Sequence, residues 1–177
     1  MQDILDGKRV MHIDTSCKLY ENRDTGIAYR IIGTNNHRGL GLSIDLKRQL
    51  DRDFKANKDY ARLYAICIYY LIHEDLNLFD VLVICGDENF NSVKRDLGLL
   101  FLESSDYFKK KIISIYELRE ITGKKKLKSY ADNLSRSYRR RALKSLARQQ
   151  KGIELNPVNI TYRMIREKWL EIDEKLK

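Results

Sequence analysis

A continuous apolar run at residues 81–85, Val-Leu-Val-Ile-Cys, constrains the fold of this chain more than any other segment. Strands with one solvated face alternate apolar and polar residues, whereas an unbroken β-branched run is typical of a strand covered on both faces. Such strands occur in parallel sheets, where helical crossovers supply the covering layers. The run therefore predicts a central strand of an α/β sheet, followed by Gly86-Asp87 at its carboxyl end.

Three β-rich runs precede this strand, at residues 8–20, 26–33 and 40–46. Turns rich in Asn, Asp and Gly separate them, and strands joined by short turns pair antiparallel. In the third run, Leu40, Leu42, Ile44 and Leu46 alternate with small or polar residues. The first part of the chain is therefore predicted to be an antiparallel meander.

Helical and strand patterns alternate in the rest of the chain. The resulting order, β-β-β-α-β-α-β-α-α, predicts an α/β fold with a mixed five-stranded sheet, antiparallel first and then parallel, flanking helices and a helical C-terminal extension. The expected elements are a helix at residues 53–75, a helix that starts at Asn91 or Ser92, a strand at 112–116, a long helix at 128–150 and a last amphipathic helix that carries Trp169.

Composition narrows the class of protein. The 177-residue chain is 43% hydrophobic and has a single proline, which favours a folded core over disorder. No apolar run approaches the roughly 18 residues that a membrane-spanning helix needs, and the first residues do not resemble a signal peptide. Cys17, Cys67 and Cys85 form no C-x-x-C pair, so we expect buried free thiols. These features predict a soluble, cytoplasmic protein without membrane contact.

Charge is distributed unevenly along the chain. Residues 1–107 contain 14 Lys+Arg and 17 Asp+Glu, whereas residues 108–177 contain 20 and 8, for a net charge of +9 overall. A basic C-terminal part predicts a polyanionic partner, and nucleic acid is the favoured one. Solvated lysine-rich helices, an anionic membrane or an acidic protein are the alternatives.

Three aspartates occupy positions that suit metal-dependent phosphodiester chemistry. Asp14 and Asp87 end predicted strands that can be neighbours in the sheet, and Asp132 begins the predicted long helix. Carboxylates at such strand ends hold Mg²⁺ or Mn²⁺, which generates hydroxide and neutralises charge on the transferred phosphate. Each aspartate alone is equally typical of a turn or of a helix N-terminus. Their combination favours a metal site.

The order of elements and these three acids resemble the ribonuclease H superfamily. Residues 14–17, Asp-Thr-Ser-Cys, resemble the Asp-Gly-Ser motif of the family's first strand. Residues 83–87 resemble its fourth strand with the terminal aspartate, and residues 130–134, Tyr-Ala-Asp-Asn-Leu, resemble its Ala-Asp-x-Leu motif. The resemblance covers about residues 8–145. It implies a two-metal nuclease that acts on RNA, DNA or a hybrid, in which Asp14 bridges two ions.

The chain departs from this family at one ligand. The family has a glutamate near the start of its first helix, one turn before an Ala-rich stretch, and the matching position here is Ala61 or Arg62. The nearest acid is Asp59, which becomes the fourth candidate ligand after a small shift of register. An arginine facing Asp14 would instead repel a cation and favour a binding protein over an enzyme.

A second, weaker resemblance is to NYN/PIN-like nucleases. Residues 80–90 are similar to the Ser-Gly-Asp-x-Asp-Phe strand of those proteins, which also cluster carboxylates around a divalent metal. Their sheet is wholly parallel, and the predicted meander at residues 8–46 fits that topology poorly.

The C-terminal part supplies the expected nucleic-acid contacts. Leu134 and Tyr138 recur at helical spacing, so one face of the basic helix is expected to dock on the protein while its cations face outward. Arginine and tyrosine stack on unpaired bases, which favours single strands or hybrids. In the last helix, Trp169 is expected to pack on the body of the protein, with a dimer or partner surface as the alternative. The candidate nucleic-acid-binding residues are Lys124, Lys125, Lys126, Arg136, Arg139, Arg140, Lys144 and Arg148.

The sequence thus favours a ribonuclease H-like core at residues 1–127, a basic helix at 128–151 that completes it, and an amphipathic helix at 152–177. The favoured function is hydrolysis of nucleic-acid phosphodiester bonds with Mg²⁺ or Mn²⁺. The catalytic candidates are Asp14, Asp87 and Asp132, with Asp59 as a further metal ligand. A non-catalytic nucleic-acid-binding or scaffold protein with the same fold is the alternative.

Overall fold

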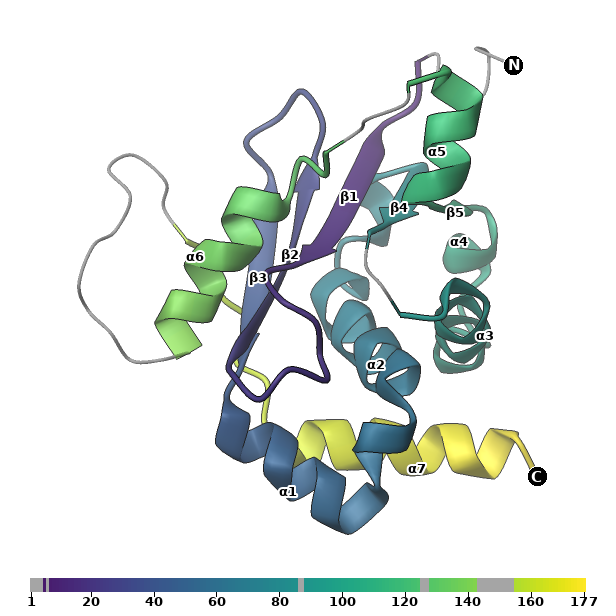
Figure 1. Ribbon diagram of the computed structural model, residues 1–177. Helices are drawn as coiled ribbons and strands as arrows, with labels where there is room; N and C mark the ends of the chain where they lie inside the picture. Colours follow the sequence, from purple (N-terminus) through teal and green to yellow (C-terminus); the bar gives the residue numbers. More distant parts are fainter. Residues whose placement is uncertain (1–4, 6, 86–87, 125–127, 143–154) are drawn as a thin grey trace.

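The computed structural model describes residues 5, 7–85, 88–124, 128–142 and 155–177 (Figure 1). They form a five-stranded sheet in the order β3-β2-β1-β4-β5. β2 pairs antiparallel with both β1 and β3, whereas β4 pairs parallel with both β1 and β5. The strands are β1 (Val10–Thr15), β2 (Thr25–Ile31), β3 (His37–Leu42), β4 (Val81–Ile84) and β5 (Lys111–Ser114).

This mixed sheet confirms the predicted α/β class, with an antiparallel meander followed by parallel pairs. It differs from the wholly parallel sheet of the NYN/PIN-like alternative, because β1, β2 and β3 pair antiparallel. None of the described helices has the length and apolarity to cross a membrane.

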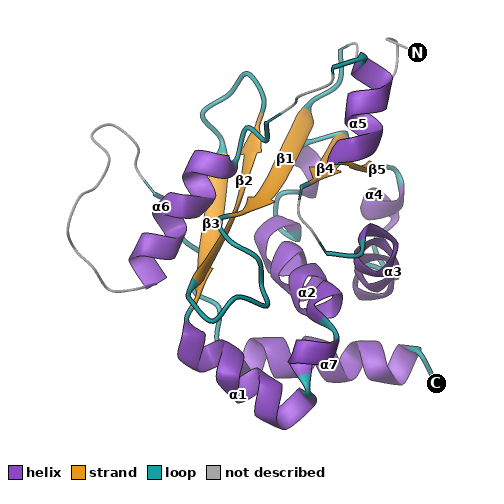
Figure 2. Ribbon diagram, viewed as in Figure 1, coloured by secondary structure: helices purple, strands orange, loops and turns teal. Residues whose placement is uncertain are grey.

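Helices cover both faces of the sheet (Figure 2). α2 (Tyr60–Ile72) and α3 (Phe90–Leu100) cover one face, and α1 (Ile44–Phe54) and α7 (Tyr162–Lys175) pack against the same layer. On the opposite face, α5 (Ile115–Thr122) covers β4 and β5, and α6 (Asp132–Ala142) covers β2 and β3. The short elements are η2 (Ala56–Lys58), η3 (Leu76–Leu78) and α4 (Ser105–Phe108).

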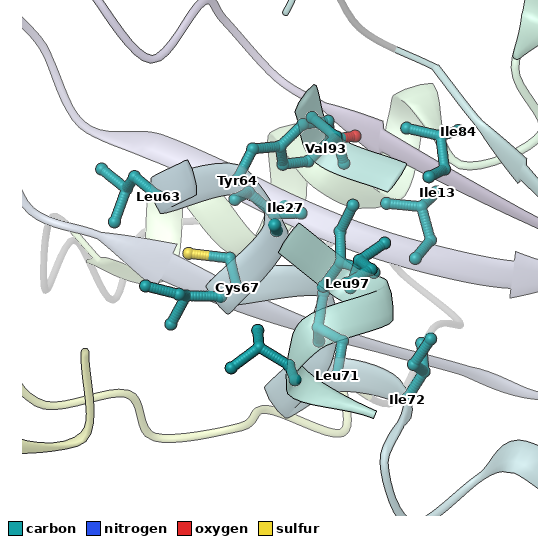
Figure 3. Packing of buried hydrophobic residues seen from close by; sticks show 14 of the residues in the cluster. Ile13, Ile27, Leu63, Tyr64, Cys67, Leu71, Ile72, Ile84, Val93 and Leu97 are labelled. Carbon is teal, nitrogen blue, oxygen red and sulfur yellow. The ribbon is translucent and has the colours of Figure 1, made fainter. Parts of the chain in front are cut away.

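All four residues of β4 are buried, as the continuous apolar run predicts. Leu82 and Ile84 belong to the core cluster under α2 and α3, and Ile84 lies beside its sheet partner Ile13 (Figure 3). Val81 and Val83 point to the other face, towards α5. Both faces of the central strand therefore lose water on folding, which is the main source of stability in such a core.

Two helices begin where the sequence indicated continued strand. Ser43 accepts a hydrogen bond from a helical N–H and starts α1, so the third strand ends at Leu42. Ser114 and Glu117 form a capping box that starts α5 directly after β5. Such caps satisfy N–H groups that a helix otherwise leaves unpaired. This local signal outweighs the alternation of residues 40–46.

α7 packs on the body of the protein through Trp169, which is 4% exposed. The indole ring lies 5.6 Å from the ring of Phe54 and 5.2 Å from the guanidinium of Arg62. The expected packing of Trp169 on the body is therefore confirmed.

α6 approaches β2 and β3 closely enough to touch their backbone. A Cβ atom at Gly26 would overlap the backbone of Ser135 and Arg139, and one at Gly39 would overlap the ring of Tyr138. Leu134 and Tyr138 are buried beside β2, as the spacing along the basic helix predicts. The predicted helix at 128–150 is described from Asp132 to Ala142, and residues 143–150 lie outside the described part.

We expect Gly26→Ala to destabilise the protein by about 3 kcal/mol, because the added methyl group meets helix backbone that has no side-chain freedom to yield. Gly98→Ala is the matched control: a Cβ there meets nothing within 4 Å, and alanine in α3 should stabilise by about 0.5–1 kcal/mol. Urea unfolding of both variants measures the difference. Equal stability of Gly26→Ala and the parent protein would contradict the close docking of α6.

Candidate carboxylate site

Asp14 lies near the carboxyl end of β1, on the sheet face that carries α5 and α6. Its Oδ1 accepts a hydrogen bond of 2.8 Å from the backbone N–H of Thr15, and the Ser129 hydroxyl also donates to it. Burial first, and then the nearby charge of Asp132, raise the pKa of Asp14 to about 6, against the lowering effects of the two hydrogen bonds and Arg136. The folded protein therefore disfavours the ionised form of Asp14, which lowers the free energy of unfolding when the carboxyl is charged.

Asp132 is the first residue of α6 and supplies the second carboxylate. It is close enough to Asp14 to raise the pKa of that carboxyl, and its Oδ2 lies 3.0 Å from Arg136 Nη2. Arg136 stands one turn later on α6, so it neutralises Asp132 from the solvent side, where its side chain is 55% exposed. Two of the three predicted carboxylates are thus brought together from distant parts of the chain.

Asp87, the third predicted carboxylate, lies outside the described residues. The strand before it is placed beside Asp14: the backbone N–H of Cys85 donates to the Ile13 carbonyl at 2.9 Å. Burial, together with the charge of Asp14, raises the pKa of the Cys85 thiol to about 12. Cys85 is therefore a neutral, buried thiol. Cys17 and Cys67 are also free and buried, as the sequence predicts.

Asp59, the fourth candidate ligand, has a different role. Its Oδ1 caps α2 by accepting from the backbone N–H of Arg62 at 3.1 Å, and its Oδ2 lies 3.4 Å from Arg62 Nε. The Arg62 side chain also pairs with Asp96 and Asp173, at 3.5 and 2.6 Å. Among the described contacts, none joins Asp59 to Asp14. Arg62 therefore links α2 to α3 and α7, and Asp59 caps the start of α2.

Sequence reasoning missed two groups at this site. The Tyr64 hydroxyl on α2 donates to the Cys85 carbonyl at 2.7 Å, and its pKa is raised well above the usual value by burial and then by the charges of Asp14 and Glu88. The sequence places Tyr64 within the predicted helix at residues 53–75 and gives it no role at the site. Glu88 follows Asp87 directly in sequence, which was the available signal for a further acid near the strand ends.

His12 is buried on the same face of β1, two residues before Asp14. Neither ring nitrogen has a hydrogen-bond partner among the described residues, and the ring meets that of Tyr130 edge-on at 5.3 Å. Burial lowers the pKa of His12 to about 4. The imidazole is therefore neutral at physiological pH and adds no positive charge beside Asp14.

The described residues contain no group of three or more His, Cys, Asp or Glu side chains arranged to hold a metal ion. The pair of Asp14 and Asp132 nevertheless has the chemistry that a divalent cation requires. Hard cations prefer carboxylate oxygens, and a cation between two mutually repelling carboxylates would offset the burial and repulsion that raise the pKa of Asp14. The two carboxylates therefore fit part of a metal site, and Asp87 would complete it.

The candidate nucleic-acid-binding residues are described only in part. Lys124 is exposed after α5, and Arg139 is half-buried on α6 near Gly26. Arg140 lies on α6. Lys125, Lys126, Lys144 and Arg148 lie outside the described residues.

We expect the stability difference between Asp14→Asn and the parent protein to depend on pH. In the folded protein the pKa of Asp14 is about 6, whereas the usual pKa of an aspartate is 3.8. The folded protein therefore binds more protons than the unfolded chain between these values, and the parent loses stability as pH rises through that window. Relative to the parent, the variant should gain about 2 kcal/mol between pH 4 and pH 7.5.

Urea unfolding at both pH values measures this change. His12 is present in both proteins, so its own titration cancels in the comparison. If the difference in free energy of unfolding between the two proteins stays constant with pH, then folding does not raise the pKa of Asp14.

Comparison of the sequence with protein-family models and with curated proteins found no match, and comparison of the fold with solved structures found none either. Functional conclusions therefore depend on the geometry of the carboxylates and on the surfaces around them.

Proposed function

We propose that this protein hydrolyses phosphodiester bonds of nucleic acid with Mg²⁺ or Mn²⁺ at the carboxylate site. The observation that carries the proposal is the pairing of Asp14 with Asp132, two acids that the sheet and α6 hold together at the end of a central strand. Desolvation of the Asp14 carboxylate without a directly paired cation is costly, and perturbed carboxylates of this kind cluster at functional sites.

The topology supports the same proposal. The sheet order β3-β2-β1-β4-β5, with one antiparallel and one parallel half, agrees with the element order on which the resemblance to the ribonuclease H superfamily rests. In this order β1 and β4 are parallel neighbours, so the residues that follow each strand leave at the same edge. Asp14 and Asp87 occupy these positions in the sequence.

In the proposed reaction, the residues of this chain would have distinct roles. Asp14, Asp132 and Asp87 would hold the divalent cation, which when bound activates water and neutralises charge on the phosphate. Ser129 and the Thr15 N–H orient the Asp14 carboxylate. Arg136 orients Asp132 and presents a cation to the phosphate backbone.

A non-catalytic nucleic-acid-binding protein is the second candidate. The observation that favours it is the use of Asp59 as a helix cap and partner of Arg62, which leaves α2 without a carboxylate contact to Asp14 among the described residues. A site with one ligand fewer holds one of its two metal positions more weakly.

Cleavage of labelled RNA–DNA hybrid, duplex DNA, and single-stranded RNA and DNA in Mn²⁺ tests the proposal. We expect Asp14→Asn and Asp132→Asn to lower the cleavage rate at least ~100-fold, because each removes charge that holds the metal. Asp106→Asn, an exposed acid on α4, is the matched control and should retain activity. Binding that weakens with salt, with no cleavage of any substrate, would instead establish the binding protein.

A further inference from the structure

Four aromatic rings are exposed in the described part of the chain, those of Tyr20, Phe108, Tyr116 and Tyr130. The three tyrosines lie on segments next to the carboxylate site. Phe108 ends α4, which precedes the amino end of β5, at the opposite edge of the sheet. A single exposed ring is common on protein surfaces, whereas several exposed rings gathered around one site are typical of a binding surface.

Tyr130 is 54% exposed and follows Ser129, the residue whose hydroxyl donates to Asp14. Its ring covers the edge of His12 on β1, which fixes the ring without burying it. Asp132 follows two residues later as the start of α6. Tyr130 is therefore held between the two carboxylate-bearing elements with more than half of its surface open.

Tyr116 is 58% exposed on the first turn of α5, directly after β5. The guanidinium of Arg119 lies 5.3 Å from the centre of its ring. The charge of Arg119 also acts on Cys85, the residue beside Asp14. α5 and α6 lie on either side of β1 in Figure 1, so Tyr116 on α5 and Tyr130 in the turn before α6 approach the site from two sides of this face.

Tyr20 extends this arrangement from the loop after β1. It is 55% exposed, with the Lys18 ammonium 5.4 Å from its ring centre and the Tyr60 ring 6.5 Å away. Two of the three tyrosines thus combine an exposed ring with an adjacent cation, which is the combination that binds a base and its phosphate together.

We infer that the carboxylate site takes single-stranded nucleic acid, whose unpaired bases stack on Tyr116 and Tyr130. The inference rests on the proposed function and specifies its substrate. A duplex offers only groove edges and backbone to these rings because its bases are already stacked, whereas a single strand offers the flat face of each base. Stacking is tolerant of sequence, so RNA and DNA share this chemistry.

Binding of unstructured 20-nucleotide RNA and DNA strands and of the matching duplexes, by fluorescence anisotropy in EDTA, tests the inference without cleavage. We expect tighter binding of the single strands, and a loss of about 10-fold in single-strand affinity for each of Tyr116→Ala and Tyr130→Ala. Tyr116→Phe and Tyr130→Phe should retain affinity because the ring remains. Phe108→Ala, which removes an equally exposed ring at the other edge, should bind like the parent.

Equal or tighter binding of the duplexes, or unchanged affinity in both alanine variants, would overturn the inference. Cleavage of duplex or hybrid in Mn²⁺ that depends on Asp14 would then still support the proposed function. Conversely, single-strand binding that depends on the tyrosines supports this inference even if no substrate is cleaved. Circular dichroism of each variant checks that it is folded.

Discussion

The contact between α6 and the glycines of β2 and β3 determines where the candidate site lies. Gly26 and Gly39 have no Cβ, so the backbone of α6 and the ring of Tyr138 rest directly on the sheet. Asp132 begins this helix, one to two turns before the residues that touch Gly26. The position of Asp132 relative to Asp14 is therefore set by the packing of the α6 backbone on the sheet.

The acidic side chains of this protein differ in how their negative charge is compensated. Arg62 pairs with three carboxylates, and the fully buried Asp96 also accepts a hydrogen bond of 2.8 Å from Arg95. In the described part of the chain, by contrast, the hydrogen-bond donors that act on Asp14 are the uncharged Thr15 N–H and Ser129, and Arg136, whose charge also acts on it, is paired with Asp132. A charge left partly uncompensated lowers stability, and such costs persist where function requires them.

The sequence predicts this fold well where the signal extends over several residues. The five-residue run at 81–85 identifies the central strand, and the repeat of Leu134 and Tyr138 identifies the docked face of α6. The starts of α1 and α5 were missed because each depends on one serine cap, and a single cap carries little weight against a longer strand pattern.

The candidate site was predictable to a similar extent. Asp14 and Asp132 carry short motifs, and the structure brings them together. The role of Asp59 depends on where α2 begins, which a cap decides to within one residue. The roles of Tyr64 and Ser129 depend on contacts between distant segments, which periodicity does not encode.

Charge and stacking would act at different ranges on a nucleic acid. The basic C-terminal part attracts any polyanion over about a Debye length, and this attraction weakens as salt rises. Base stacking on Tyr116 and Tyr130 requires contact and depends little on salt. Under the proposed function, an acidic site that repels phosphate would need both: the cations would keep the strand nearby, and the rings would place it across Asp14. Affinity at low salt therefore reports the basic surface, whereas the preference for single strands that persists at high salt reports the tyrosines.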